Sequence, residues 1–316
     1  MPSLLAMVVL VACDKTPSTS DSDSPAPFEF PEITSEAVAN YAAIVEASYG
    51  DSLTTAQTLD ASLEALVADP TEANLTAAKD AWKASRVPYL QTEVYRFYDG
   101  PIDNPTDGPE GLLNAWPLDE HYIDYVEGDA TAGIVNGTDS IDGASLEGLN
   151  EVGGEKNIAT GYHAIEFLLW GQDLSDTGPG ARPATDYVTD GTGTAENQDR
   201  RGTYLTVSGD LLIDHLTLVH DAWAPTATYR TDFEADAEGS FAKILTGMII
   251  LSGFETGGER LQAALDSGDR EDEHSCFSDN TKVDMVEDVR GIQNVWEGSY
   301  GSISGVGIKD VVAEVD

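Results

Sequence analysis

A histidine and a glutamate three residues apart, inside an apolar segment, give this chain its clearest potential for chemistry. His163 and Glu166 lie in residues 161–171, which read G-Y-H-A-I-E-F-L-L-W-G. On a helix, residues three apart share a face, so the imidazole and the carboxylate point the same way. Because the flanking side chains are apolar, both groups need a partner, such as each other or a cation. We therefore take His163 and Glu166 as candidate metal ligands.

The spacing alone is not specific. With five His and 57 acidic residues in the chain, about one His followed three residues later by a carboxylate is expected by chance. A second such pair, His121 and Asp124, lies in a polar stretch that contains Pro117, where we expect both side chains to be solvated. The apolar context and the flanking glycines set the first pair apart.

The segment 271–280, E-D-E-H-S-C-F-S-D-N, packs four carboxylates and one imidazole into ten residues. Such ligands suit Fe, Zn, Mn or Ca. The alternative is a solvated acidic loop that caps the next helix. An apolar Cys-Phe pair at residues 276–277 favours a functional role, because it would draw Glu273, His274 and Ser275 towards a packed surface.

A third group follows the rhythm of one helix face at positions 82, 86, 89, 93 and 96. Its members are Trp82, Arg86, Tyr89, Glu93 and Arg96. Arginine is scarce in this chain, so each Arg here is expected to pair with a carboxylate. An ion pair at a helix–helix contact is favoured over a direct role in binding.

Composition excludes several classes of function. The formal net charge is −41, from 16 basic and 57 acidic residues, so nucleic acid is not expected as a partner and an anionic membrane surface would repel the chain. The acidity suits a solvated surface in salty surroundings, or a field that concentrates cations. No H-E-x-x-H, P-loop, dinucleotide fingerprint, G-x-S-x-G or paired C-x-x-C motif occurs.

The N-terminal residues predict export. Residues 1–13 resemble a lipoprotein-type signal that ends at Cys13, which would be lipidated, and the apolar run is too short to span a bilayer. Residues 14–32 are rich in Ser, Pro and Asp and are expected to form a disordered tether. Cys276 is then the remaining cysteine. We predict a protein of the cell envelope, periplasmic or on the outer surface, held to the membrane by its lipid anchor only.

The rest of the sequence predicts an all-α fold, since strand-like alternation is sparse. The Gly- and Pro-rich residues 171–199 divide it into two helical-bundle halves packed side by side, 33–180 and 181–316. A Trp on a charged helix in each half, in 80–93 and 288–300, hints at an internal duplication. Helices are expected at 35–67, 71–97 with a kink at Pro88, 110–126, 155–170, 200–223, 240–265 and 281–298.

Taken together, the motifs resemble the imelysin-like family, also called insulin-cleaving metalloproteinase-like, which includes iron-regulated protein A. The G-x-H-x-x-E motif is matched at residues 161–171. Further matches are W-K-A-S-R-V-P-Y-L-Q-T-E-V-Y-R-F with the following G-P-I-D, then G-F-E-T-G-G-E-R-L, E-D-E-H-S-C-F-S-D-N-T and R-G-I-Q-N-V-W-E-G-S-Y. They occur in order across residues 40–307, which makes the resemblance far more specific than any single motif.

The resemblance implies two bundle-like halves with a site between them, an envelope location and a link to iron uptake. It also implies that this chain lacks the last helices of the second bundle, because similar proteins continue beyond the equivalent of residues 302–315. The implied site centres on His163 and Glu166. Its candidate neighbours are Arg86, Glu93, Glu273, His274 and Ser275.

Three functions remain open. The first is a lipoprotein that binds a metal ion or an iron compound, with iron or zinc as the metal and envelope iron-transport components as partners. The second is a metallopeptidase that uses the H-x-x-E motif, which requires a metal with an open position and a general base. The third is a non-catalytic structural or adhesion module in which His163 and Glu166 hold two helices together.

Overall fold

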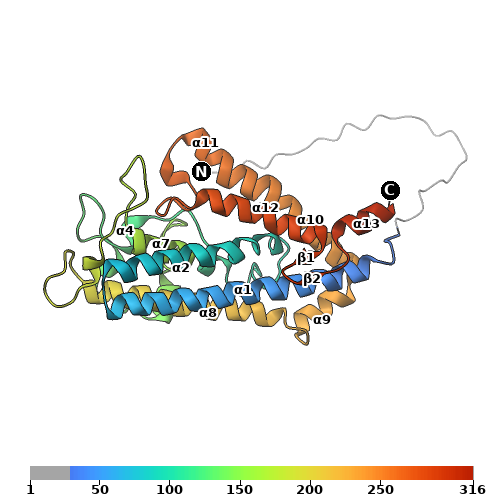
Figure 1. Cartoon of the computed structure of the whole chain (residues 1–316), viewed down its shortest axis with the longest axis horizontal. Helices are drawn as coiled ribbons and strands as arrows, with labels where there is room; N and C mark the ends of the chain where they lie inside the picture. The colour runs from blue at the N-terminus through green and yellow to red at the C-terminus, as the bar shows by residue number, and fades with distance from the viewer. Residues whose placement is uncertain (1–28, 316) are drawn as a thin grey trace, which may run out of the picture. The chain divides into compact units, whose positions relative to one another are not determined.

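The computed structural model describes residues 29–315, and these fold almost entirely into helices (Figure 1). Residues Pro31–Asp316 form one compact unit. Within the described residues, the strands are β1 (Ser299–Tyr300) and β2 (Ile303–Ser304), which pair antiparallel as one hairpin. The predicted all-α fold class is confirmed. Between residues 29 and 315, every helix is too short or too polar to cross a membrane.

Two long helices at the start of the described chain form the first layer. α1 (Thr34–Ala68) and α2 (Glu72–Leu90) are joined by a turn at Pro70. The Thr71 hydroxyl caps α2 by accepting a hydrogen bond from the Asn74 amide at 3.3 Å. Apolar side chains at helical spacing bury one face of α1, as the sequence predicts. They include Val38, Tyr41, Val45, Tyr49, Leu59, Leu63 and Leu66.

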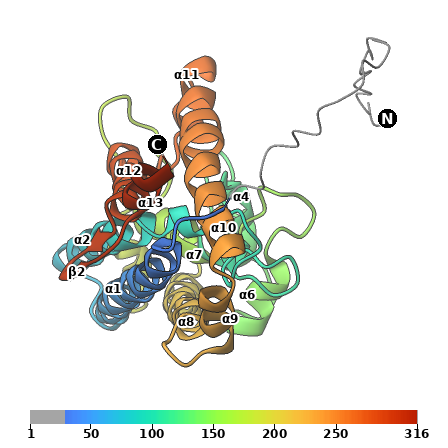
Figure 2. The ribbon, with the colours of Figure 1, turned by 90° about the vertical axis from the view of Figure 1, so that its right-hand side faces the viewer.

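The helix that carries the G-x-H-x-x-E motif lies inside a bundle. α7 (Gly161–Trp170) contacts α2 and α8 (Gln198–Ala222), and α8 also runs along α1 (Figures 1 and 2). A helix from the predicted second half therefore packs against helices of the predicted first half. The division at residue 180 and the internal duplication stay predictions.

Both glycines that flank the motif have backbone conformations that favour glycine. Gly161 has φ of 83°, and a Cβ there would lie 2.4 Å from the carbonyl oxygen of Leu113. Gly171 has φ of 67° and ends α7, with its amide donating to the Phe167 carbonyl at 2.7 Å. These values favour glycine, because other residues are strained at positive φ. The helix therefore starts at Gly161 rather than at residue 155 as predicted.

The segment between α2 and α7 is a series of turns and short helices. The helix predicted over 110–126 is wrong in detail: it is two helices of one turn, α3 (Glu110–Leu113) and α4 (Glu120–Ile123), with Pro117 between them. Proline lacks the amide hydrogen that a continuous helix would need there. Two more short helices follow, α5 (Gly133–Asn136) and α6 (Gly143–Leu149).

The predicted second helix also ends earlier than expected. α2 stops at Leu90, two residues after Pro88, and a short 3₁₀ helix, η1 (Glu93–Tyr95), follows. Positions 82, 86 and 89 share α2, whereas Glu93 and Arg96 belong to the next segment. The predicted single helix face from 82 to 96 is therefore wrong beyond residue 90.

The C-terminal part is built on one continuous helical rod (Figure 2). It consists of α10 (Ala237–Ile250), the π-helical segment η3 (Leu251–Gln262) and α11 (Ala263–Ser267). The predicted helices at 200–223, 240–265 and 281–298 are confirmed to within a few residues. The remaining elements are η2 (Ala184–Tyr187), α9 (Thr228–Ala235), η4 (Arg270–Asp272), α12 (Thr281–Glu297) and α13 (Ile308–Val315).

The predictions for the N-terminus cannot be placed in this fold. The predicted lipidation site Cys13, the predicted signal at 1–13 and most of the predicted tether at 14–32 lie outside the described residues.

Candidate functional site

The G-x-H-x-x-E helix is buried along its whole length, and α2 holds both of its ends. Every residue of α7 is buried. The Trp82 indole N–H on α2 donates to the Tyr162 carbonyl at 2.9 Å, and the rings of Trp82 and Trp170 lie 5.3 Å apart. The apolar frame predicted around the motif is therefore present.

His163 and Glu166 are bonded to each other, as their helical spacing predicts. His163 Nδ1 lies 2.9 Å from Glu166 Oε2, and the two side chains are 1% and 0% exposed. The other carboxylate oxygen, Oε1, accepts hydrogen bonds from the Ser278 amide at 3.0 Å and from the Ser278 hydroxyl at 2.6 Å. His163 Nε2 has no hydrogen-bond partner among the described residues.

The 271–280 segment supplies a second histidine–carboxylate pair. His274 Nδ1 lies 2.7 Å from Oδ2 of Asp284, which is on the first turn of α12. The same carboxylate accepts hydrogen bonds from the Ser275 hydroxyl, from the Asn280 amide at 2.9 Å and from Arg86 Nη2 at 3.2 Å. Asp284 is the residue around which this half of the site is built, and sequence reasoning missed it.

The two pairs meet at their imidazole rings. The ring centroids of His163 and His274 lie 4.8 Å apart, with the ring planes at 76°. The indole of Trp116 also packs against His274, with the ring centroids 5.7 Å apart. Residues more than 100 positions apart in the sequence thus place two imidazoles side by side in a buried environment.

Burial and neighbouring arginines keep both imidazoles neutral. Burial, reinforced by the Arg86 guanidinium, holds the pKa of His163 well below its usual range. Burial and then Arg260 do the same for the pKa of His274. Burial would raise the pKa of Asp284, but Arg86 and the hydrogen bond from His274 hold it below its usual range. Burial raises the pKa of Glu166 to about 8, against the opposing hydrogen bond from Ser278.

A neutral imidazole has one donor nitrogen and one acceptor nitrogen. Because Asp284 is ionised, His274 donates its hydrogen from Nδ1 and leaves Nε2 with a free lone pair. Because the pKa of Glu166 is raised to about 8, His163 adopts the same form only when Glu166 gives up its proton, which a cation at Nε2 would favour. A carboxylate that holds Nδ1–H while Nε2 faces a metal is the usual outer-shell arrangement of metal-binding histidines.

A polar cavity of about 180 Å³ lies beside His274. Asn114 Nδ2 and Arg96 Nε are buried donors without a hydrogen-bond partner in the described chain. They can donate to the oxygen atoms of a bound group. The cavity is lined by Arg96, Glu110, Asn114, Ala115, Trp116, Glu151, Glu255, Arg260 and His274.

One wall of this cavity rests on a buried ion network. Glu93 accepts hydrogen bonds from Arg96 at 2.7 Å and from Arg260, and Arg260 also pairs with Asp288 at 3.0 Å and Glu255 at 3.0 Å. Burial alone would raise the pKa of Glu93, but Arg96 and Arg260 lower it to about 2. Glu93 therefore lies next to the cavity as an ionised anchor for two arginines.

Of the other predicted neighbours, Arg86, His274 and Ser275 contact Asp284, whereas Glu273 does not. Arg86 lies inside the site, where it bonds Asp284 and, through Nη1, Asn114 at 2.5 Å. His274 and Ser275 both contact Asp284. Glu273 is half-buried, and among residues 29–315 its side chain forms no hydrogen bond or ion pair with the site.

For His121 and Asp124, the second pair at this spacing, the expectation that both side chains are solvated is wrong for Asp124. His121 is exposed, as expected, but Asp124 is completely buried and accepts hydrogen bonds from Arg182 at 2.8 Å and Arg201 at 2.6 Å. Its position three residues after His121 has no role, because the arginines come from distant segments.

The residues present can supply some of the ligands of a metal ion, but not all of them. No group of three or more His, Cys, Asp or Glu side chains within residues 29–315 is arranged to hold a metal ion. His163 and His274 offer two imidazole nitrogens, one Nε2 each. Glu166 and Asp284 are not free to bind a metal, because they already bond to the Nδ1 atoms of these two histidines. Two imidazoles suit Zn, Fe, Cu or Ni, provided that a bound compound or water completes the coordination sphere.

Comparisons with known proteins identify relatives of this chain. Iron-regulated protein A of Synechococcus elongatus is 26% identical over 258 residues, a match that covers 81% of this chain and 62% of the relative. This chain therefore spans less than two thirds of that curated relative.

A crystal structure of a protein described as an iron-regulated protein A precursor, from Parabacteroides distasonis, has the same fold. It aligns with a TM-score of 0.63 at 19% identity, over 90% of this chain and 78% of that one. The sequence profile of the imelysin family, Peptidase_M75, matches residues 45–316. Because that match covers most of the sequence and includes both histidine–carboxylate pairs, this chain belongs to the imelysin family.

Proposed function

We propose that this protein is an exported, iron-related envelope protein that binds a metal ion or a metal compound, with iron as the metal, through His163 and His274. The observation that carries the proposal is the pair of neutral imidazoles 4.8 Å apart, each bonded at Nδ1 to an acidic side chain. The names of the relatives, which are iron-regulated proteins, support iron as the metal.

A metal compound fits the site better than a bare ion. The two histidines would hold the metal, and the compound would supply the remaining ligands. The cavity beside His274 has room for a small ligand of this kind, and Asn114 Nδ2 and Arg96 Nε are unpaired donors for its oxygen atoms. The cavity wall carries two arginines, Arg96 and Arg260, and three glutamates, Glu110, Glu151 and Glu255, so a compound with both anionic and cationic or neutral parts can find partners there.

A purely structural role for the pair leaves one observation unexplained. In a structural His–Glu contact, the second imidazole nitrogen would also find a partner, because a buried polar atom without one costs about 1–3 kcal/mol. His163 Nε2 is buried and has none among the described residues. A ligand at Nε2 would offset that cost.

The metallopeptidase alternative has less support. A general base must reach the attacking water, but Glu166 is engaged on both oxygens, by His163 and Ser278, and Asp284 is engaged by four donors. The chain also covers only part of its curated relative. Peptide cleavage that is abolished by Glu166→Gln would restore this alternative.

The proposal includes the envelope location and the anchor. Cys13 would carry the lipid, and components of envelope iron transport would pass on the cargo. Labelling of the expressed protein with a radioactive fatty acid, lost in Cys13→Ser, tests the anchor independently of metal binding.

Calorimetric titration with Zn²⁺ and with ferric citrate tests the site. We expect His163→Ala and His274→Ala each to weaken binding at least about tenfold, which is the effect of losing a ligand worth 1.4 kcal/mol or more. His121→Ala is the matched control, because His121 is exposed and precedes a carboxylate at the same spacing. Equal binding by all four proteins would overturn the proposal.

A further inference from the structure

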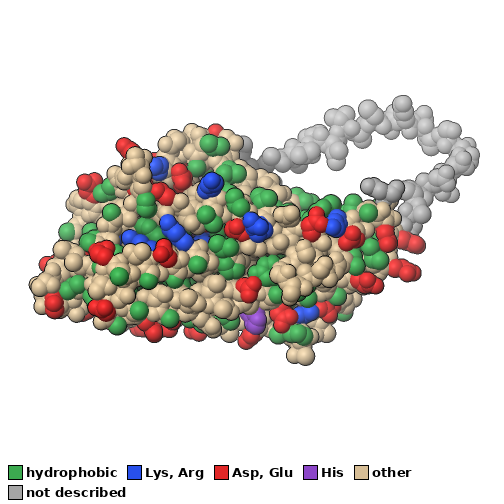
Figure 3. Space-filling model, viewed as in Figure 1, with side chains coloured by type: hydrophobic (Ala, Val, Ile, Leu, Met, Phe, Trp, Pro, Cys, Tyr) green, Lys and Arg blue, Asp and Glu red, His purple; other side chains and the backbone are tan. Residues whose placement is uncertain are grey.

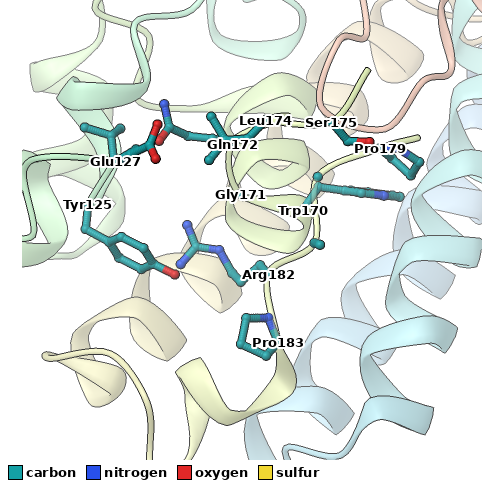
Figure 4. A pocket seen from close by; sticks show the side chains of 13 residues that line it. Tyr125, Glu127, Trp170, Gly171, Gln172, Leu174, Ser175, Pro179, Arg182 and Pro183 are labelled. Atoms are coloured by element: carbon teal, nitrogen blue, oxygen red, sulfur yellow. The ribbon is translucent and has the colours of Figure 1, made fainter. Parts of the chain in front are cut away.

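A second, larger cavity lies at the C-terminal end of α7, around Trp170, with residues 171–183 forming much of its wall (Figure 4). Its volume is about 440 Å³, which is within the range of small-molecule sites. The lining shares no residue with the cavity beside His274. Its apolar side chains include Tyr125, Val126, Trp170, Leu174, Pro179 and Pro183.

Arg182 is the cation of this cavity, and its side chain extends towards Tyr125 (Figure 4). Arg182 is 4% exposed. Its guanidinium carbon lies 4.9 Å from the ring centroid of Tyr125 and 5.6 Å from that of Phe167. Nη1 donates to Asp124 at 2.8 Å and to Asp186 at 3.3 Å, whereas Nε and Nη2 have no hydrogen-bond partner in the described chain.

The nearby carboxylates cannot satisfy these two nitrogens as they stand. Asp124 also accepts hydrogen bonds from Arg201 Nε at 2.6 Å and Arg201 Nη2 at 3.0 Å. Asp186 accepts from the Thr194 hydroxyl at 2.8 Å. Nε–H and Nη2–H lie on one edge of the guanidinium, and this edge matches the two oxygens of a carboxylate.

Gly171 leaves space beside that edge. It lines the cavity, and a Cβ at this position would lie 3.5 Å from Arg182 Nε and 3.3 Å from Arg182 Cβ. A larger side chain at residue 171 would therefore cover the Nε side of the guanidinium.

Acidic side chains are spread over the surface of the protein (Figure 3), but basic side chains also lie close to this cavity. Lys79 Nζ lies 5.3 Å and Lys83 Nζ 5.5 Å from the ring centroid of Trp170. Among the lining residues Arg182 is the basic one and Glu127 the acidic one. Lys79 and Lys83 thus lie next to Trp170, which lines the cavity, and Arg182 is the basic side chain that a bound carboxylate would meet.

We propose that this cavity binds a small aromatic carboxylate, with its carboxylate on Nε and Nη2 of Arg182 and its ring against Trp170 and Leu174. Two parallel N–H···O bonds would satisfy both unpaired donors, and the apolar walls would bury the ring. The site is independent of the histidine pair and of the metal.

The probe is 2-naphthoate, titrated into the full chain by calorimetry and followed by tryptophan fluorescence. We expect binding that weakens with added salt, and at least tenfold weaker binding of the neutral 2-naphthamide. Arg182→Lys keeps the positive charge but loses the two-donor edge, so it should weaken naphthoate binding at least tenfold.

A second variant keeps the test decisive if Arg182→Lys does not fold. Leu174 is 64% exposed at the cavity, so Leu174→Glu places a negative charge there without disturbing the core. It should weaken naphthoate binding at least threefold. Val289→Glu adds the same charge at a residue on α12 that is 57% exposed and should have no effect. Equal binding of naphthoate and naphthamide, unchanged affinity in Leu174→Glu, or no binding at millimolar concentrations would overturn the proposal.

Discussion

His163 and His274 come from segments 111 residues apart, yet their imidazole rings lie 4.8 Å apart and each is held by its own carboxylate. The relationship joins the G-x-H-x-x-E helix to the acidic loop before α12. It turns two separate sequence features into one site, and it rests on side chains whose contribution can be measured one by one.

The tautomer of His163 is the first quantity open to test. Glu166→Gln keeps the shape and lets the amide oxygen accept from Ser278, but the amide nitrogen must then donate to His163 Nδ1. His163 would carry its hydrogen on Nε2 and could no longer ligate a metal. We expect the variant to fold with native stability and to bind Zn²⁺ at least about tenfold more weakly, a loss of 1.4 kcal/mol or more. Unchanged affinity would show that Nε2 is not a ligand.

The buried pair of Arg86 and Asp284 predicts a large coupling. Both side chains are fully buried and lie 3.2 Å apart, so Arg86→Met leaves Asp284 as an unpaired buried charge and should cost about 3–5 kcal/mol. Asp284→Asn added to Arg86→Met should recover part of that loss. Urea unfolding of the two single variants and the double variant measures the coupling. Strictly additive losses would contradict a direct ion pair.

The first glycine of the motif should be far less replaceable than an ordinary loop glycine. Gly161→Ala puts a Cβ 2.4 Å from the Leu113 carbonyl oxygen at φ of 83°, and we expect a loss of about 2 kcal/mol or more. Gly178→Ala is the control, because nothing lies within 4 Å of its added Cβ. Thermal unfolding of both variants should separate them clearly; similar melting temperatures would be inconsistent with the strained start of α7.

A pH dependence follows from Glu120. Burial raises its pKa from 4.5 to about 7, against the hydrogen bond from Gln172. The folded state then binds the proton more tightly than the unfolded state, so this group contributes its stability below pH 4.5 and loses it as the pH rises towards 7. Relative to wild type, Glu120→Gln should therefore gain about 1–2 kcal/mol between pH 4.5 and 7, after allowance for solvent screening. A difference in unfolding free energy that stays flat over this range would contradict the buried carboxyl.

The sequence predicts the parts of the site that are local along the chain. Helical spacing places His163 next to Glu166, and the apolar frame predicts their burial. The family resemblance places Arg86, His274 and Ser275 nearby, and the structure brings all three to Asp284. Glu273 does not join them, because its side chain forms no hydrogen bond or ion pair with the site among the described residues.

The hydrogen-bond partners that are distant in the sequence could not be predicted from the sequence. Ser278 reaches Glu166 over 112 residues, and Asp284 bonds Arg86 over 198. Among 57 acidic residues, nothing in the spacing of Asp284 marks it, although its place on the first turn of α12, close to the acidic loop, is a usable signal. The same holds for Arg182, because only the structure shows that its Nε and Nη2 atoms have no hydrogen-bond partner among the described residues.

Boundaries of helices depended on backbone geometry that spacing does not show. The late start of α7 at Gly161 follows from a positive φ and a close approach to the Leu113 carbonyl that a side chain would not allow. The early end of α2 comes two residues after Pro88, whose ring fixes φ and removes a backbone donor.

X-ray absorption spectroscopy of the zinc-loaded chain tests the central claim most directly. The account predicts two imidazole nitrogens at the usual Zn–N distance of about 2.0–2.1 Å, with the remaining ligands being light atoms from water or buffer. The imidazole signal should fall to one in His163→Ala and in His274→Ala and stay at two in His121→Ala. A spectrum without imidazole scattering, or one that is the same in all four proteins, would contradict it.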